Sequence, residues 1–257
     1  TWPRMQVNLI PCFRRLQGPR CRLALRPVGY AFSPEMERKI IRTADGSKTI
    51  QLSEWKEQYH SLHGAIQDAY HVFIHHGLSQ FEDRELEVLE MGFGTGLNAL
   101  ITLLEAPGRG LKVRYSALEA YPVAEAEWTL LDYGSSLEQY PDAVSHYKAI
   151  HKAPWESMQP VSNGFSIHKM QMDFLDFSAA PRFDLVYFDA FGARVQPELW
   201  TEAIFGQMYS ALKPGGILVT YSAKGSVRRA MQASGFLTER LPGPPGKREM
   251  LRARKPD

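Results

Sequence analysis

The chain has 257 residues, of which 44% are hydrophobic and 23% are charged, and its formal net charge is +2. These values exclude a disordered, collagenous or fibrous protein and fit one large α/β domain with a modest extension. No apolar run approaches the roughly 20 residues that cross a bilayer. No signal-peptide pattern is visible either, so we expect a cytoplasmic protein.

The first 39 residues are expected to form a basic, arginine-rich extension, to which we assign no function. Both cysteines of the chain, Cys12 and Cys21, lie in this extension. They have no matching cysteine or histidine pair that could complete a zinc site. Reduced thiols are therefore expected, with a disulfide between them as the alternative.

Residues 40–85 are expected to form a small appendage that precedes the main domain. An alternating pattern over 40–52 around Asp45-Gly46 predicts a β-hairpin with a two-residue turn, added to the main sheet. Residues 54–78 are predicted to be largely helical. This stretch holds His60, His63, His71, His75 and His76. Because no carboxylate-histidine motif such as H-E-x-x-H is present, polar packing over a ligand pocket or at the surface is favoured over a metal site.

Three glycines at alternate positions follow an apolar run and lead directly into a helical pattern. The pattern predicts a strand over 86–91, a tight turn at Gly92, Gly94 and Gly96, and a helix over 97–104. Glycine lets backbone N–H groups approach a polar ligand, because any side chain would fill that space. The G-x-G-x-G spacing differs from the dinucleotide fingerprint G-x-G-x-x-G and looks like motif I of S-adenosylmethionine-dependent methyltransferases. A simple turn after a strand is the alternative.

A carboxylate follows each of the next three predicted strands. Strand 113–118 is followed by Glu119, strand 165–172 by Asp173, and the strand in 182–191 ends at Asp189. A doubly wound fold places the acceptor for the ribose hydroxyls about 25 residues past the glycines. Glu119 stands at this position, so we predict that it binds the ribose. Asp173 can accept a hydrogen bond from the exocyclic amine of adenine in such a fold. Asp189 is expected to point into the crevice where such sheets bind ligands.

The remaining pattern continues the alternation of strands and helices. The interval 121–164 is predicted to be an enlarged, helical crossover, because one helix would be enough to join two parallel strands. Further elements are expected as helices over 197–212 and 227–233 and as strands over 217–221 and 249–252. The alternation predicts a doubly wound, mostly parallel α/β sheet over 86–257, covered by helices on both sides.

The end of the chain is basic although the whole protein is nearly neutral. Its basic residues are Lys224, Arg228, Arg229, Arg240, Lys247, Arg248, Arg252, Arg254 and Lys255, against Glu239 and Glu249. This distribution fits a surface that binds RNA, and a solvated basic tail is the alternative.

Several segments together resemble one family closely. They are Tyr187-Phe188-Asp189-Ala190-Phe191, Pro197-Glu198-Leu199-Trp200, Val227-Arg228-Arg229 with Ala233-Ser234-Gly235-Phe236, Gly246-Lys247-Arg248-Glu249-Met250 and Gly92-Phe93-Gly94-Thr95-Gly96-Leu97-Asn98. Over residues 43–252 the chain is similar to the methyltransferase domain of the tRNA 5-methylaminomethyl-2-thiouridine biosynthesis protein MnmC. The resemblance implies a Rossmann-like class I methyltransferase fold. The chain departs from its relatives at Ala190 and Met172, where they carry glycine, and both neighbouring acids are kept.

The resemblance also implies a reaction. S-adenosyl-L-methionine would be the cofactor, without flavin or metal, and the methyl group would pass to the amine of 5-aminomethyl-2-thiouridine at the tRNA wobble position. The expected partner is the tRNA anticodon region. Because no flavin-binding glycine turn is present, the chain looks like a stand-alone methyltransferase that works with a separate oxidase or aminomethyl-forming pathway.

The residues fall into three predicted roles. The cofactor site is predicted to comprise Gly92, Phe93, Gly94, Gly96, Asn98, Glu119, Asp173 and Phe174. Asp189 is the predicted proton acceptor at the amine. Phe191 and Tyr221 are expected to line the pocket for a flipped-out base, and Arg228, Arg229, Lys247 and Arg248 to bind anticodon phosphates.

Two alternatives keep the same fold. A polyamine synthase would transfer an aminopropyl group from decarboxylated S-adenosylmethionine. Such enzymes resemble this chain in the glycine turn and strand-end acids, but they generally carry a second acid where Gly192-Ala193 stands and would not need a basic end. A non-catalytic RNA-binding protein on a methyltransferase fold would have lost its cofactor residues, which this chain keeps.

Overall fold

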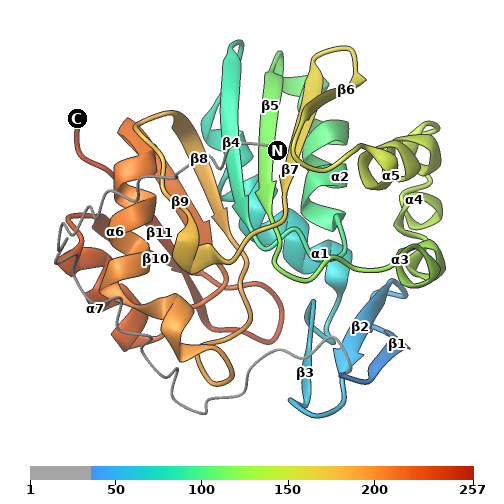
Figure 1. Ribbon diagram of the computed structural model, residues 1–257, viewed down its shortest axis with the longest axis horizontal. Helices are drawn as coiled ribbons and strands as arrows, with labels where there is room; N and C mark the ends of the chain where they lie inside the picture. The colour runs from blue at the N-terminus through green and yellow to red at the C-terminus, as the bar shows by residue number, and fades with distance from the viewer. Residues whose placement is uncertain (1–35) are drawn as a thin grey trace, which may run out of the picture.

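An eight-stranded, mostly parallel sheet forms the centre of the molecule in the computed structural model, which describes residues 36–257 (Figure 1). The strand order is β10-β11-β9-β8-β4-β5-β7-β6, and β6 and β11 run antiparallel to their neighbours. The strands are β4 (Glu85–Met91), β5 (Lys112–Leu118), β6 (Met158–Ser162), β7 (Phe165–Met170), β8 (Phe183–Phe188), β9 (Leu212–Thr220), β10 (Leu237–Pro242) and β11 (Glu249–Arg254). The predicted α/β fold is confirmed, while Cys12 and Cys21 lie outside the described residues.

Helices cover both faces of this sheet (Figure 1). The α-helices are α1 (Ala65–Ala69), α2 (Leu97–Glu105), α3 (Glu125–Leu131), α4 (Tyr133–Ser136), α5 (Ala143–Lys152), α6 (Glu202–Ala211) and α7 (Gly225–Ala233); shorter helical turns are η1 (Tyr70–His75), η2 (Leu78–Gln80), η3 (Pro107–Arg109), η4 (Phe174–Asp176) and η5 (Pro197–Trp200). One core cluster packs η1, α2 and α5 on the sheet, and the other packs α6 and α7 on it. All six residues of β8 are buried, because both faces are covered. None of the helices in residues 36–257 is long and apolar enough to cross a membrane.

A separate three-stranded sheet precedes the main domain. It consists of β1 (Arg38–Arg42), β2 (Lys48–Leu52) and β3 (Glu57–Gln58). The predicted hairpin is confirmed and lies in a sheet of its own beside the main sheet, but the prediction of a two-residue turn is wrong. Arg42 pairs with Lys48, and the loop between them is held by the Asp45 carboxylate, which accepts from the Thr43 hydroxyl at 2.7 Å and the Ser47 N–H at 3.0 Å.

Other predicted boundaries are wrong for local reasons. The helix expected over 54–78 begins only at Ala65, because the Tyr59 N–H donates to the Ile50 carbonyl at 2.9 Å and holds this segment against the small sheet. The helix expected over 197–212 is split at Thr201, whose side chain caps α6. Strands β6 and β10 were not predicted; β10 ends in a proline, which an edge strand tolerates.

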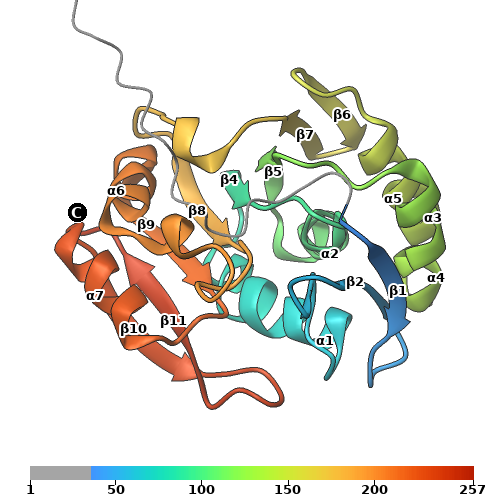
Figure 2. The same ribbon diagram turned by 60° about the horizontal axis from the view of Figure 1, so that its bottom comes forward.

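The strand order reverses at β4, which pairs with β5 on one side and with β8 on the other. A crevice for ligands is expected outside the carboxyl ends of strands at such a point. The small sheet is attached there: Arg194, which follows β8, donates to the Glu57 carboxylate and the Trp55 carbonyl, each at 2.9 Å. Figure 2 brings β1 to β3 and α1 forward beside this end.

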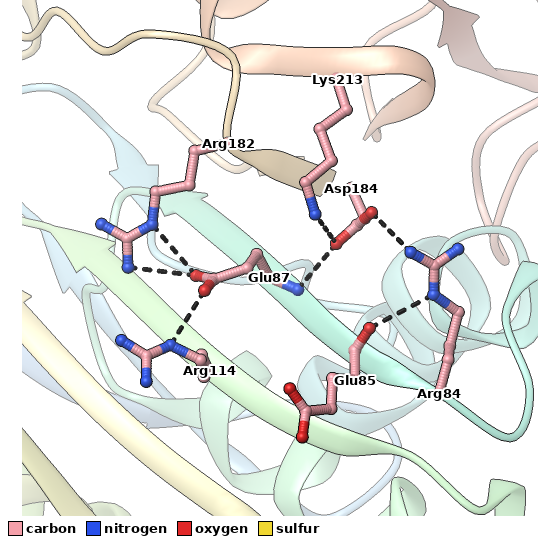
Figure 3. A network of polar contacts seen from close by, with 7 residues as sticks. All are labelled: Arg84, Glu85, Glu87, Arg114, Arg182, Asp184 and Lys213. Atoms are coloured by element: carbon pink, nitrogen blue, oxygen red, sulfur yellow. Dashed lines mark hydrogen bonds and ion pairs between the residues drawn. The ribbon is translucent and has the colours of Figure 1, made fainter.

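Ion pairs connect the strands near their amino-terminal ends. The residues are Arg84, Glu87, Arg114, Arg182, Asp184 and Lys213 (Figure 3). The buried Asp184 carboxylate accepts from Arg84 at 2.8 Å, from Lys213 at 2.9 Å and from the Glu87 N–H at 2.9 Å. The Glu87 carboxylate in turn pairs with two arginines, at 2.9 and 3.1 Å. These contacts join β4, β5, β8 and β9.

We predict that Asp184→Ala lowers the free energy of unfolding by about 2 kcal/mol, because the Glu87 N–H loses its acceptor. Asp184→Asn keeps an acceptor and is expected to cost less. Urea unfolding followed by circular dichroism measures both. The exposed Glu85→Gln is the matched control on the same strand. An unchanged unfolding midpoint for Asp184→Ala would contradict the role assigned to this carboxylate.

Candidate active site

The crevice at the carboxyl ends of the strands contains a cavity of about 920 Å³. This volume is in the range of small-molecule sites. Eleven of the predicted site residues line it: Gly92, Phe93, Gly94, Asn98, Glu119, Asp173, Phe174, Asp189, Phe191, Tyr221 and Lys247. Gly96, Arg228, Arg229 and Arg248 are not part of its lining. The structure therefore brings most of the predicted site together and separates three of its four cations from it.

The glycine turn requires glycine both for its conformation and for its close contacts. Gly92, Gly94 and Gly96 have φ values of +102°, +49° and +73°, in the region that side chains disfavour. A Cβ on Gly92 would lie 2.7 Å from the backbone oxygen of Asp189, and one on Gly96 would lie 2.8 Å from His151 Nε2. Gly96 thus turns the chain into α2 without lining the cavity.

Glu119 supports this turn from the end of β5. One carboxylate oxygen accepts from the Gly94 N–H at 2.9 Å, and the other accepts from the Tyr121 N–H at 2.8 Å. Burial raises the pKa of this carboxyl, and these N–H groups oppose the rise. Each oxygen of a carboxylate can accept more than one hydrogen bond, so Glu119 can also bind hydroxyls in the cavity.

Asp173 and Phe174 form the next part of the wall. The Asp173 carboxylate accepts from the Leu175 N–H at 3.0 Å and thereby starts η4 directly after β7. Phe174 is buried and lines the cavity beside it. An acid and an aromatic ring at adjacent positions suit an adenine base, because the acid can accept from its amine and the ring can pack on its π face.

Asn98 connects two carboxylates beneath the glycine turn. Its side-chain amide donates to Glu90 Oε1 at 2.9 Å and to Asp189 Oδ2 at 2.8 Å. An amide has two N–H donors, so each carboxylate receives one. Asn98 is predicted to bind the cofactor; it lines the cavity, and its amide also holds Asp189 in position.

These two carboxylates have different protonation behaviour. Burial raises the pKa of Asp189 to about 6, while the bond from Asn98 opposes the rise. Burial raises the pKa of Glu90 well above its usual range, and Asp189 adds to the rise. Burial therefore favours the neutral form of Glu90, whereas Asp189, with a pKa of about 6, can be ionised at pH 7. Glu90 is not among the site residues predicted from the sequence. An acid between the apolar residues Leu89 and Met91 was a usable signal of a functional carboxyl group.

The histidines of 60–76 divide between the cavity and other parts of the molecule. His60 and His63 line the cavity, whereas His71, His75 and His76 do not. His60 Nε2 lies 2.7 Å from the Thr95 hydroxyl, and burial together with Lys247 lowers the pKa of His60 to about 4. Within residues 36–257 no group of three or more His, Cys, Asp or Glu side chains is arranged to hold a metal.

Comparisons with known proteins agree with this geometry. Residues 156–256 match a family model described as S-adenosyl-L-methionine-dependent methyltransferase. The tRNA 5-methylaminomethyl-2-thiouridine biosynthesis bifunctional protein MnmC of Aromatoleum aromaticum is 31% identical over 214 residues, which cover 77% of this chain and 33% of that protein. MnmC of Ectopseudomonas mendocina is 29% identical over 209 residues, which cover 75% of this chain and 31% of that protein. The chain thus spans about one third of the length of these relatives.

Solved structures share the fold. MnmC2 from Aquifex aeolicus aligns with a TM-score of 0.69 and 24% identity over 87% of this chain and 73% of that chain. Spermidine synthase from Thermotoga maritima aligns with a TM-score of 0.52 and 13% identity over 89% of this chain and 72% of that chain. This similarity shows a common fold alone. The family model over residues 156–256, together with the shared fold, supports a methyltransferase that uses S-adenosyl-L-methionine. Over about three quarters of its length the chain is similar to part of the MnmC proteins.

We predict that Glu90→Gln folds with a melting temperature close to that of the natural chain, because an amide matches the neutral acid and can still accept from Asn98. Glu90→Ala leaves a cavity and an unpaired amide donor and is expected to cost about 2–4 kcal/mol. Calorimetry of both variants measures the difference.

Because the folded state holds the Glu90 proton more tightly than the unfolded chain, the natural chain loses stability as the pH rises above the usual glutamate range. Glu90→Gln is expected to lose less, and an equal loss would contradict the assigned protonation.

Proposed function

We propose that this protein methylates the amine of 5-aminomethyl-2-thiouridine at the wobble position of tRNA. The observation that carries the proposal is the position of Asp189, which Asn98 holds beside the glycine turn in the cavity. The proposal also rests on the similarity of the chain to proteins that are named for biosynthesis of the methylated nucleoside. The cavity also contains aromatic side chains, Phe191 and Tyr221, against which a base taken out of its stack can pack.

The residues of the cavity fit S-adenosyl-L-methionine. Gly92, Phe93 and Gly94 line the cavity, and the absence of a side chain at Gly92 and Gly94 leaves room for a ligand beside the turn. Glu119 would hold the ribose hydroxyls, and Asp173 with Phe174 would hold the adenine. When bound, this cofactor supplies a methyl carbon activated by a positively charged sulfur.

Asp189 would orient the amine and receive its proton. The bound cofactor would supply the methyl group to the amine nitrogen, and the Asp189 carboxylate would accept the proton that this nitrogen releases. Asp189 must be ionised for this role, and the amide of Asn98 keeps one of its oxygens occupied, so that the other can face the amine.

We predict that Asp189→Asn reduces methyl transfer at least about a hundredfold, because the variant has no proton acceptor at this position. The assay combines labelled S-adenosyl-L-methionine with tRNA from a strain lacking this enzyme, and mass spectrometry of the nucleosides identifies the product. Cofactor affinity, measured by calorimetry, should remain within a few-fold. Parallel reactions with decarboxylated S-adenosylmethionine and putrescine test the aminopropyl alternative and should give no product.

The pH dependence provides a second measurement of the same role. Because the pKa of Asp189 is raised to about 6, kcat/KM should fall as the pH drops below about 6, where the carboxylate becomes protonated. Retained turnover in Asp189→Asn, or a rate independent of pH between 5 and 7 in the natural chain, would remove Asp189 from the mechanism.

The exposed cations outside the cavity are proposed to contact tRNA phosphates. Arg229 on α7 and Arg248 between β10 and β11 are exposed, so they can reach a backbone that cannot enter the cavity. We predict that replacing both by alanine weakens tRNA binding. The slope of log Kd against log salt should decrease by about 0.7–0.9 for each phosphate that the variant no longer neutralises. The exposed Lys112→Ala, at the opposite end of the sheet, is the control. An unchanged slope in the double variant would exclude these two arginines from the tRNA surface.

A further inference from the structure

The cavity contains a second charged corner, formed by Asp68 and Lys247. Asp68 lies on α1, is 8% exposed and lines the cavity, and Lys247 comes from the loop between β10 and β11. Lys247 Nζ lies 3.7 Å from Asp68 Oδ2 and 4.3 Å from the centre of the Tyr221 ring. Two segments nearly the whole domain apart in sequence therefore place an acceptor and a donor side by side in this cavity.

This corner is incompletely paired. Asp68 Oδ1 is buried and has no hydrogen-bond partner among residues 36–257. The 3.7 Å ion pair is also longer than a charged hydrogen bond, which is typically about 2.7–2.9 Å. A buried carboxylate oxygen without a donor is costly, and native structures rarely keep one unless a ligand or water completes it. A merely structural salt bridge would be expected to close to hydrogen-bond distance.

Both members of the corner act on Asp189. Lys247 lowers the pKa of the Asp189 carboxyl and Asp68 raises it. Burial raises the pKa of Asp68 itself, while Lys247, Ser61 and His63 oppose that rise. Asp68, Lys247 and Asp189 all line the same cavity. A substrate whose amine meets Asp189 has its neighbouring polar atoms within reach of the corner.

We propose that Asp68 and Lys247 recognise the imide edge of the methyl-acceptor base, with the Asp68 carboxylate accepting from N3–H and Lys247 Nζ donating to O4. This inference rests on the proposed function. In a uracil-type base, the C5 substituent, O4 and N3–H follow one another along one edge. Lys247 lies beside Asp68 in the cavity that Asp189 also lines, so Lys247 can face O4 while Asp68 faces N3–H. A cytosine edge offers a donor and an acceptor in the reverse order and would leave both side chains mispaired.

The test uses two anticodon stem-loop RNAs, one with 5-aminomethyl-2-thiouridine and one whose modified base is also methylated at N3. For the natural chain, N3-methylation should lower kcat/KM about tenfold or more, because the imide donor is removed. Asp68→Ala should lower kcat/KM for the first RNA by a similar factor, with little further loss on the second. Such non-additivity identifies a direct contact. Equal, multiplicative losses would overturn the proposal.

Controls separate this inference from the proposed function and from folding. Gln67→Ala, at an exposed neighbouring position, should leave both rates unchanged. Cofactor affinity should be the same in all variants. If Asp68→Ala does not fold, Asp68→Asn preserves size and should show the same non-additivity with a smaller loss. If the natural chain binds cofactor but methylates neither RNA, the proposed function fails and this inference fails with it; methylation of both RNAs at equal rates overturns the inference alone.

Discussion

The amide of Asn98 between two carboxylates is the contact on which the candidate site depends. Glu90 and Asp189 end adjacent parallel strands, and without a shared donor their oxygens would face each other in a buried space. The amide can occupy this position because the glycine turn brings α2 directly over the strand ends. Gly92 in turn permits the backbone of β4 to pass against Asp189. Backbone conformation, helix position and carboxylate geometry therefore depend on one another.

The molecule places stabilising and functional charges at opposite ends of the same sheet. Near the amino-terminal ends of the strands, Asp184 and Glu87 are fully paired with cations and backbone (Figure 3). At the carboxyl ends, Asp189 is half-buried and accepts from Asn98, and the buried Asp68 Oδ1 has no hydrogen-bond partner among residues 36–257. Partly satisfied buried carboxylates reduce stability, so a well-paired network elsewhere is consistent with keeping them available for a ligand.

The small sheet completes the cavity. Tyr59 lies against Gly94, and its ring packs edge-on against Phe191 with a centroid separation of 4.9 Å. Trp55 packs on the other side of Phe191, at 5.6 Å. Because Arg194 also binds this sheet, the segment after β8 is held by contacts from the amino-terminal appendage. The appendage is thus part of the site, and residues 57–63 form one of its walls.

The sequence by itself determined the doubly wound domain, the glycine turn and the three strand-end acids, because strand and helix periodicities and glycine spacing are local. It also identified Asp189, Phe191 and Tyr221 as neighbours of one cavity through their resemblance to known motifs. Only the tertiary structure decided that Asn98 binds two acids, that burial raises the pKa of Glu90, and that Lys247 belongs to the cavity while Arg248 does not. These properties arise from burial and from contacts between distant segments. The separate small sheet, the late start of α1 and the pairing of Lys247 with Asp68 have the same origin: no local pattern encodes which surfaces meet when the chain is folded.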